Sequence, residues 1–226
     1  MTSDLKLPLN ARSRASIPRW RVSALLLATV LLLPATHAWS DGAPNAVQHL
    51  AVGVCATCHG ARGISNLSKI PVLAGQSEAY LTAQLHAFKT QTRGDADAIG
   101  YMWGMAADLT DEQILNLSHY YATAAAPAET HASSRQTVMA QISVGHDIYT
   151  QGIVERGVPA CSACHGQEAH GLGDFPRLAG QHAAYITKQL LAFQNTTRDV
   201  AVMHAVTTTL QHAEMTAVAT YLQSLP

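Results

Sequence analysis

The sequence predicts an all-α protein built from two similar domains in tandem. Apolar residues recur at intervals of three and four, which is the period of an amphipathic helix, and no stretch alternates as a half-buried strand does. A third observation is an internal repeat, because residues 71–93 and 176–198 are identical at 14 of 23 positions. A repeat of this kind predicts that one structural unit occurs twice.

Residues 1–38 are expected to be a secretory signal peptide. Four arginines precede an uncharged run of 12 residues, Val22 to Leu33, and small residues follow up to Ala38. The order basic, apolar, small is typical of such a peptide, and the run is shorter than the roughly 18 residues of a spanning helix. The expected location is the periplasm. An uncleaved anchor, and with it association with a membrane, stays an open alternative.

The charge balance of the remaining chain indicates protein partners. Residues 1–38 hold five of the basic residues and one acidic residue, so residues 39–226 carry 9 basic against 14 acidic side chains, a formal charge of −5. No basic run or stripe follows the leader, so a nucleic-acid partner is not expected. Docking faces on the partners are expected to be basic.

Both predicted domains show the same order of elements. The first domain is expected over residues 45–122 and the second over 136–226, joined by an Ala/Pro/Ser/Thr-rich linker over 123–135. Each begins with a short helix and a cysteine-containing box, followed by a glycine-containing loop and a Pro-x-Leu-Ala-Gly-Gln element. A middle helix, a methionine loop and a closing helix complete each copy.

The middle and closing helices are predicted from their apolar faces. The middle helices carry Tyr80, Leu81, Leu85 and Phe88, and Tyr185, Ile186, Leu190 and Phe193. The closing helices carry Ile114, Leu117 and Tyr121, and Met215, Val218 and Leu222. Thr110 and Gln113 have the spacing of a capping box, which places the start of the first closing helix.

All four cysteines lie in two Cys-x-x-Cys-His boxes. In this pattern two thiols bond to the vinyl groups of a haem, and the adjacent imidazole binds its iron. We therefore predict two haem c groups held by the residues of these boxes: Cys55, Cys58 and His59, and Cys161, Cys164 and His165. A redox dithiol needs no such histidine, and zinc sites usually have closer cysteine pairs, so both alternatives are disfavoured. A buried haem would also complete the core of domains this short.

A methionine that recurs in register is expected to be the sixth iron ligand in each domain. Met102 lies seven residues before Leu109, and Met203 lies seven before Leu210, at the start of each closing helix. A thioether ligand closes the iron site and raises its potential, which favours electron transfer over catalysis.

Three other side chains are weaker ligand candidates, because none of them recurs in both copies. They are Met105, His86 and His204, whose counterparts Val206, Leu191 and Trp103 do not ligate iron.

Two prolines and two arginines recur around these boxes. Pro71 and Pro176 lie 16 and 15 residues after the first cysteine of each box. A ligating imidazole usually donates its other N–H to a carbonyl, and the proline carbonyl is the candidate acceptor; the alternative is that each proline only stiffens its loop. Arg93 and Arg198 end the repeated segments and are candidates to meet haem propionates or to be exposed caps of the helix C-terminus.

Together these motifs resemble the dihaem cytochromes of the c4 type. The resemblance covers residues 39–226 and rests on both boxes, the Pro-x-Leu-Ala-Gly-Gln and Tyr-x-x-x-Gln-Leu-x-x-Phe motifs, and the residues Pro71, Pro176, Met102 and Met203. It implies two tandem class I cytochrome c-like domains related by pseudo-twofold symmetry, with His/Met ligation. Gly145 and Tyr149 resemble the family's contact between first and last helices, near Tyr221. The first domain lacks this signature, and its segment before Met102 is four residues longer.

The resemblance implies a carrier of single electrons between periplasmic redox proteins. The donor would be a dehydrogenase or a cytochrome complex and the acceptor an oxidase or a reductase, in complexes that can be membrane-associated. The alternative is an electron-accepting subunit of a larger periplasmic dehydrogenase, of the sulfide or alcohol type. A catalytic haem is disfavoured, because it requires an open sixth position.

Overall fold

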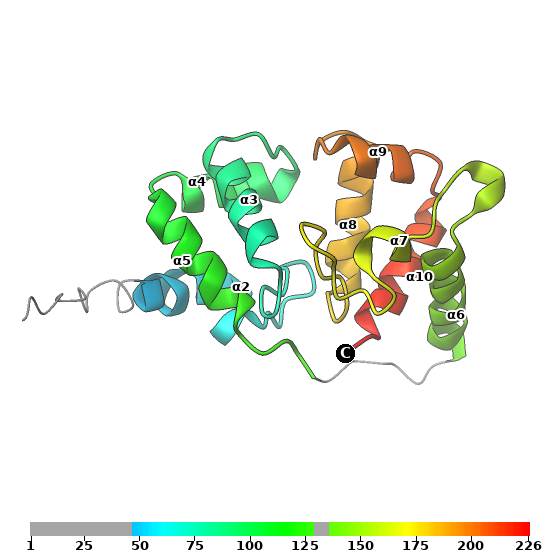
Figure 1. The fold of residues 1–226 in the computed structure, drawn as a ribbon, viewed down its shortest axis with the longest axis horizontal. Coiled ribbons are helices and arrows are strands. Elements are labelled where there is room, and N and C mark those ends of the chain that lie inside the picture. The colour runs from blue at the N-terminus through cyan, green and yellow to red at the C-terminus, as the bar shows by residue number, and fades with distance from the viewer. Residues whose placement is uncertain (1–46, 129–135) are drawn as a thin grey trace, which may run out of the picture. The chain divides into compact units, whose positions relative to one another are not determined.

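The computed structural model describes residues 47–128 and 136–226, here called the first half and the second half, and no strand occurs in either (Figure 1). The all-α prediction is therefore confirmed. Both halves belong to one compact unit. The expected leader and residues 129–135 of the expected linker lie outside the described residues. None of the described helices is both long and apolar enough to cross a membrane.

The first half is a set of short helices around α3 and α5. After helical residues 47–50, the elements are η1 (Ala51–Cys55), α2 (Ala56–His59), η2 (Ala61–Gly63), α3 (Glu78–Lys89), η3 (Ala98–Met102), α4 (Trp103–Ala106) and α5 (Asp111–Ala122). Helix α3 packs on α4 and α5. The buried cluster beneath them comprises Val47, Ala51, Leu81, Leu117 and Tyr121.

The second half repeats this plan with a longer first helix. Its elements are α6 (Gln136–Gln151), η4 (Val154–Arg156), α7 (Ser162–His165), α8 (Ala183–Gln194), α9 (Ala201–Thr207) and α10 (His212–Gln223). Helix α10 packs on α6 and α8 (Figure 1). Its core includes Ile148, Tyr149, Ile186, Val218 and Leu222.

The middle and closing helices lie where the apolar period predicted them, as α3, α8, α5 and α10. At the start of α5 the Thr110 hydroxyl accepts from the Gln113 N–H at 3.1 Å, and the Gln113 side chain accepts from the Thr110 N–H at 2.8 Å, so the capping box is confirmed. Helix α10 has an equivalent box between Gln211 and Glu214. The sequence did not indicate it, because glutamine is not among the usual capping residues.

The methionine segments are helical rather than loops, which corrects the expectation from sequence. In the first half the Trp103 indole donates to the Arg93 carbonyl at 2.8 Å, and in the second the His204 imidazole contacts the Phe193 carbonyl through Nδ1 at 3.0 Å. The first bond ties α4 to the segment that follows α3, and the second ties α9 to the last turn of α8. Trp103 and His204 are in register, but their acceptors Arg93 and Phe193 are not counterparts in the repeat, so no local pattern reveals these contacts.

The first and last helices of the second half cross at Gly145. A Cβ there would collide with the Ala217 carbonyl and with Cβ of Tyr221. One turn later Tyr149 is fully buried, donates to the Gly166 carbonyl at 2.6 Å, and lies 5.5 Å from the Tyr221 ring. The contact that the resemblance implied between α6 and α10 is present in the structure.

We expect Gly145→Val to destabilise the second half by about 2 kcal/mol, because the added side chain must push α6 away from α10. Guanidinium unfolding followed by helix circular dichroism measures the loss. Gly53→Ala is the matched control, since a Cβ at this helical position meets nothing within 4 Å. A Gly145→Val protein as stable as the control would contradict the close crossing.

Candidate functional site

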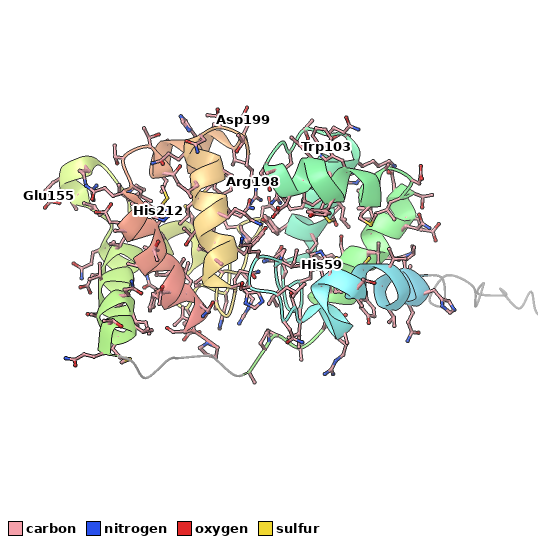
Figure 2. All side chains as sticks on the ribbon, turned by 180° about the vertical axis from the view of Figure 1, so that it is seen from behind. His59, Trp103, Glu155, Arg198, Asp199 and His212 are labelled. Atoms are coloured by element: carbon pink, nitrogen blue, oxygen red, sulfur yellow. The ribbon has the colours of Figure 1, made fainter. Side chains whose placement is uncertain are left out.

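Each Cys-x-x-Cys-His box folds into a helical turn that a glycine ends. In the first half Cys55 ends η1, and Cys58 and His59 lie in α2, where Figure 2 labels His59. Residues three and four apart in a helix share a face, so the two thiols and the imidazole are brought together. Gly60 follows with φ of 75°, and a Cβ there would overlap the Ile64 carbonyl. Only glycine tolerates this turn.

The second box repeats the first. Cys161 precedes α7, which holds Cys164 and His165, and Gly166 follows with φ of 82°. The same turn at both places shows that the duplication preserved the local geometry of the box.

Both box histidines have one ring nitrogen bound to a proline carbonyl. His59 Nδ1 lies 2.9 Å from the Pro71 carbonyl oxygen, and His165 Nδ1 lies 3.0 Å from that of Pro176. A carbonyl can only accept, so Nδ1 carries the proton and Nε2 keeps its lone pair. Burial lowers the pKa of both imidazoles, against the opposing effect of these bonds. A neutral imidazole with a free Nε2 is the form that binds a metal.

Burial favours the protonated form of the first thiol in each box, which argues against redox or zinc chemistry there. No disulfide joins any of the four cysteines. Burial raises the pKa of Cys55, and it raises the pKa of Cys161 to about 11. A thiol that holds its proton is a poor redox nucleophile and a poor metal ligand. Within the described ranges no three His, Cys, Asp or Glu side chains group as a metal site.

The two predicted methionines lie half-buried in corresponding short helices. Met102 ends η3 and packs against Phe88 and Ala106, while Met203 lies within α9. Met105 is 58% exposed. The difference in burial favours Met102 over Met105 as a side chain directed into the first half.

Arg93 and Arg198 are buried, so they are not the exposed helix caps that the sequence left as an alternative. Arg93 donates to Gln189 of the second half at 2.9 Å and to Gln84 at 2.8 Å. Arg198, labelled in Figure 2, donates to the same two glutamines at 2.8 and 2.7 Å and to the Tyr80 hydroxyl at 2.7 Å. The sequence did not reveal that the two arginines are buried, because each also bonds a glutamine of the other half about a hundred residues away.

One carboxylate balances these two charges in part. Asp95 accepts from Arg93 at 2.6 Å, with side chains only 7% and 5% exposed for Arg93 and Asp95. Burial raises the pKa of Asp95, but the charge and hydrogen bonds of Arg93 outweigh burial and lower it overall. Burial likewise acts to raise the pKa of the Tyr80 hydroxyl, whereas Arg198 and Arg93 bring it below its ordinary value. The contact between the halves is therefore a buried site of net positive charge.

Sequence reasoning did not identify Asp95, Gln84 or Gln189 as functional residues. Gln84 and Gln189 are identical in the repeat, which was the available signal. Asp95 lies between Arg93 and Met102, in a segment four residues longer than its counterpart, so the repeat defines no partner position for it.

A helical fold with two Cys-x-x-Cys-His turns, each with its histidine oriented by a carbonyl, defines a c-type cytochrome with two haem sites. The sequence profile of the family described as Cytochrome c matches residues 45–125 and again 145–226. The chain therefore belongs to the cytochrome c family, as a dihaem cytochrome of the c4 type with two covalently bound haem c groups and a function in electron transfer.

Three similar proteins support this placement. Cytochrome c4 of Thiocapsa roseopersicina is 37% identical over 190 residues, 81% of this chain and 93% of that protein. The thiosulfate dehydrogenase electron acceptor of Thiomonas intermedia strain K12 is 34% identical over 223 residues, 94% of each chain. The solved cytochrome c4 of Acidithiobacillus ferrooxidans aligns with a TM-score of 0.71 and 37% identity, over 76% of this chain and 98% of that one.

Proposed function

We propose that this chain carries single electrons in the bacterial periplasm, from a dehydrogenase or cytochrome complex to an oxidase or reductase. The observation that carries the proposal is the duplicated site, in which each box imidazole is fixed by a proline carbonyl at Nδ1 and free at Nε2. When bound, each haem supplies an iron centre that takes up and releases one electron. The chain orients the ligands, excludes water and holds the two sites in one unit.

The proposed iron ligands are His59 and Met102 in the first half, and His165 and Met203 in the second. The half-buried position of Met102 and the exposure of Met105 support this choice. With a thioether in the sixth position neither iron has an open site, which supports a carrier rather than a catalyst.

The proposed role of Arg93 and Arg198 is to face the haem propionates, and that of Pro71 and Pro176 is to accept from the ligand imidazoles. Arg93 pairs with the Asp95 carboxylate, whereas the hydrogen bonds of Arg198 go to the neutral groups of Gln189, Gln84 and Tyr80, and buried charges need partners of opposite sign. Propionates at the contact between the halves would supply them.

Export to the periplasm is proposed from the leader-like residues 1–38, and the division into domains at 123–135 is proposed from composition. In the structure α5 ends at Ala122 and α6 begins at Gln136, which supports that division.

A second candidate function is favoured by one relative, which is named a thiosulfate dehydrogenase electron acceptor. In this role the chain would be the electron-accepting component of a dehydrogenase that oxidises thiosulfate. The covalent haem sites and the acidic balance of residues 39–226 are compatible with both roles.

Mixing the two-haem protein with thiosulfate and a purified thiosulfate dehydrogenase tests the donor. We expect both haems to become reduced, with two electrons taken up per chain, and no reduction by thiosulfate alone. The rate should fall as salt is added if the docking is electrostatic. A dehydrogenase that reduces another cytochrome but not this one would reject this donor. Reduction by thiosulfate without the dehydrogenase would reject the carrier role itself.

A further inference from the structure

Two buried glutamines connect the halves in a reciprocal manner. Gln76 and Gln181 end the two Pro-x-Leu-Ala-Gly-Gln elements, and each is 7% exposed. The Gln181 side chain accepts from the Val72 N–H at 2.9 Å and donates to the Val72 carbonyl at 2.9 Å. The Gln76 side chain accepts from the Arg177 N–H at 2.7 Å and donates to the Arg177 carbonyl at 2.9 Å. Each side-chain amide therefore pairs at two points with the backbone of the opposite half.

The backbone groups held in this way include the acceptors of the box histidines. The Pro71 carbonyl and the Val72 N–H belong to one planar peptide group. Its oxygen accepts from His59 of the same half at 2.9 Å, and its N–H donates to Gln181 of the other half. The second site repeats this arrangement with Pro176, Arg177, His165 and Gln76. We call these two groups, 71–72 and 176–177, the proline peptides.

A hydrogen bond at one end of a peptide group affects the other end. When the N–H donates, the peptide is polarised and its oxygen becomes a better acceptor. A stronger acceptor at Nδ1 makes the imidazole a more basic ligand and fixes its ring. A more basic ligand favours ferric over ferrous iron and so lowers the reduction potential.

We propose that Gln181 and Gln76 are positioning residues that set the reduction potential of the haem in the opposite half. Gln181 acts through proline peptide 71–72 on His59, and Gln76 acts through proline peptide 176–177 on His165. This inference rests on the proposed ligation by His59 and His165. Each half thereby sets the reduction potential of the haem in the other half, and this effect requires that the two halves are in contact.

The alternative role for these glutamines is simple adhesion between the halves. Other contacts already provide adhesion without touching a proline peptide. They are the bond of His182 Nε2 to the Ser65 carbonyl at 2.9 Å, the ion pair of Lys188 with Asp97, and the arginine cluster, by which we mean Arg93 and Arg198 with Gln84, Gln189, Tyr80 and Asp95. Loss of adhesion affects both haems alike, whereas the positioning role predicts that each substitution acts on the haem of the other half.

The test is a redox titration of the two-haem proteins Gln181→Leu and Gln76→Leu. Leucine removes the amide while keeping the side chain similar in size. Each haem is followed separately by the NMR signal of its ligand methionine, assigned beforehand with Met102→Ala and Met203→Ala. We expect Gln181→Leu to raise the potential of the haem at Cys55 and Cys58 alone, and Gln76→Leu that of the other haem alone. The expected size is about a tenfold change in the ratio of reduced to oxidised haem, about 59 mV for one electron.

The control His182→Leu removes a side-chain contact between the halves next to Gln181 that touches neither proline peptide, and both potentials should stay at their wild-type values. Gln181→Asn and Gln76→Asn should also shift only the haem of the opposite half, because asparagine is one methylene too short to reach the proline peptide. Either asparagine variant can be used if the corresponding leucine variant does not fold. A shift of both haems together, a shift in the same half as the substitution, or no shift would overturn the proposal. Failure of the ligand assignment would instead appear in the wild-type spectrum, before any glutamine is changed.

Discussion

Replacing Met203 by alanine should abolish the methionine–iron absorption band of one haem and leave that of the other intact. The thioether is the group that closes the sixth position and raises the potential. Alanine cannot reach the iron, so the band should lose about half of its intensity and the potential of the second-half haem should fall. Optical spectra of the oxidised protein and a potentiometric titration measure the two effects. A band of unchanged intensity would show that Met203 is not a ligand.

Met102→Ala should abolish the methionine–iron band of the first-half haem and lower its potential. Met105→Ala is the matched control. Met105 lies three residues later and is 58% exposed, whereas Met102 packs against Phe88 and Ala98. Met105→Ala should therefore keep both bands. If Met102→Ala keeps both bands and Met105→Ala removes one, the ligand of the first half is Met105.

The helices could be predicted from sequence because their signals are local. Apolar residues at three- and four-residue spacing, and the Thr110–Gln113 capping box, are contained within one element each. The helical form of the methionine segments could not be predicted in this way. It depends on hydrogen bonds from Trp103 to the Arg93 carbonyl and from His204 to the Phe193 carbonyl, which are tertiary contacts.

The sequence could predict those parts of the site whose residues all lie in one half. The boxes and the proline carbonyls are arranged within one half, so spacing and metal chemistry were enough to name them. The arginine cluster needs partners from both halves, because Gln84 and Gln189 each accept from both arginines. A single sequence shows that Arg93 and Arg198 recur, but it cannot show that they meet.

Replacing Asp95 by asparagine should destabilise the protein at pH 7 by about 3 kcal/mol, because asparagine lacks the negative charge that pairs with the buried Arg93 at 2.6 Å. Denaturant unfolding of the two-haem protein measures the loss. Asp97→Asn is the matched control from the same segment between Arg93 and Met102. Asp97 pairs with Lys188, with side chains 39% and 29% exposed, and a pair this exposed contributes less than about 1 kcal/mol.

The difference in stability between wild type and Asp95→Asn should decrease at low pH. Folding lowers the pKa of Asp95 below its ordinary value of 3.8, so its contribution is complete above that pH and disappears as the pH falls through the folded value. The gap in stability between wild type and Asp95→Asn should therefore stay constant from pH 7 to about pH 5 and narrow below pH 3.8. Because the haems stay covalently attached on unfolding, the same titration can be run on both proteins without loss of cofactor. A gap that is unchanged at pH 3 would mean that the charge of Asp95 does not stabilise the contact between the halves.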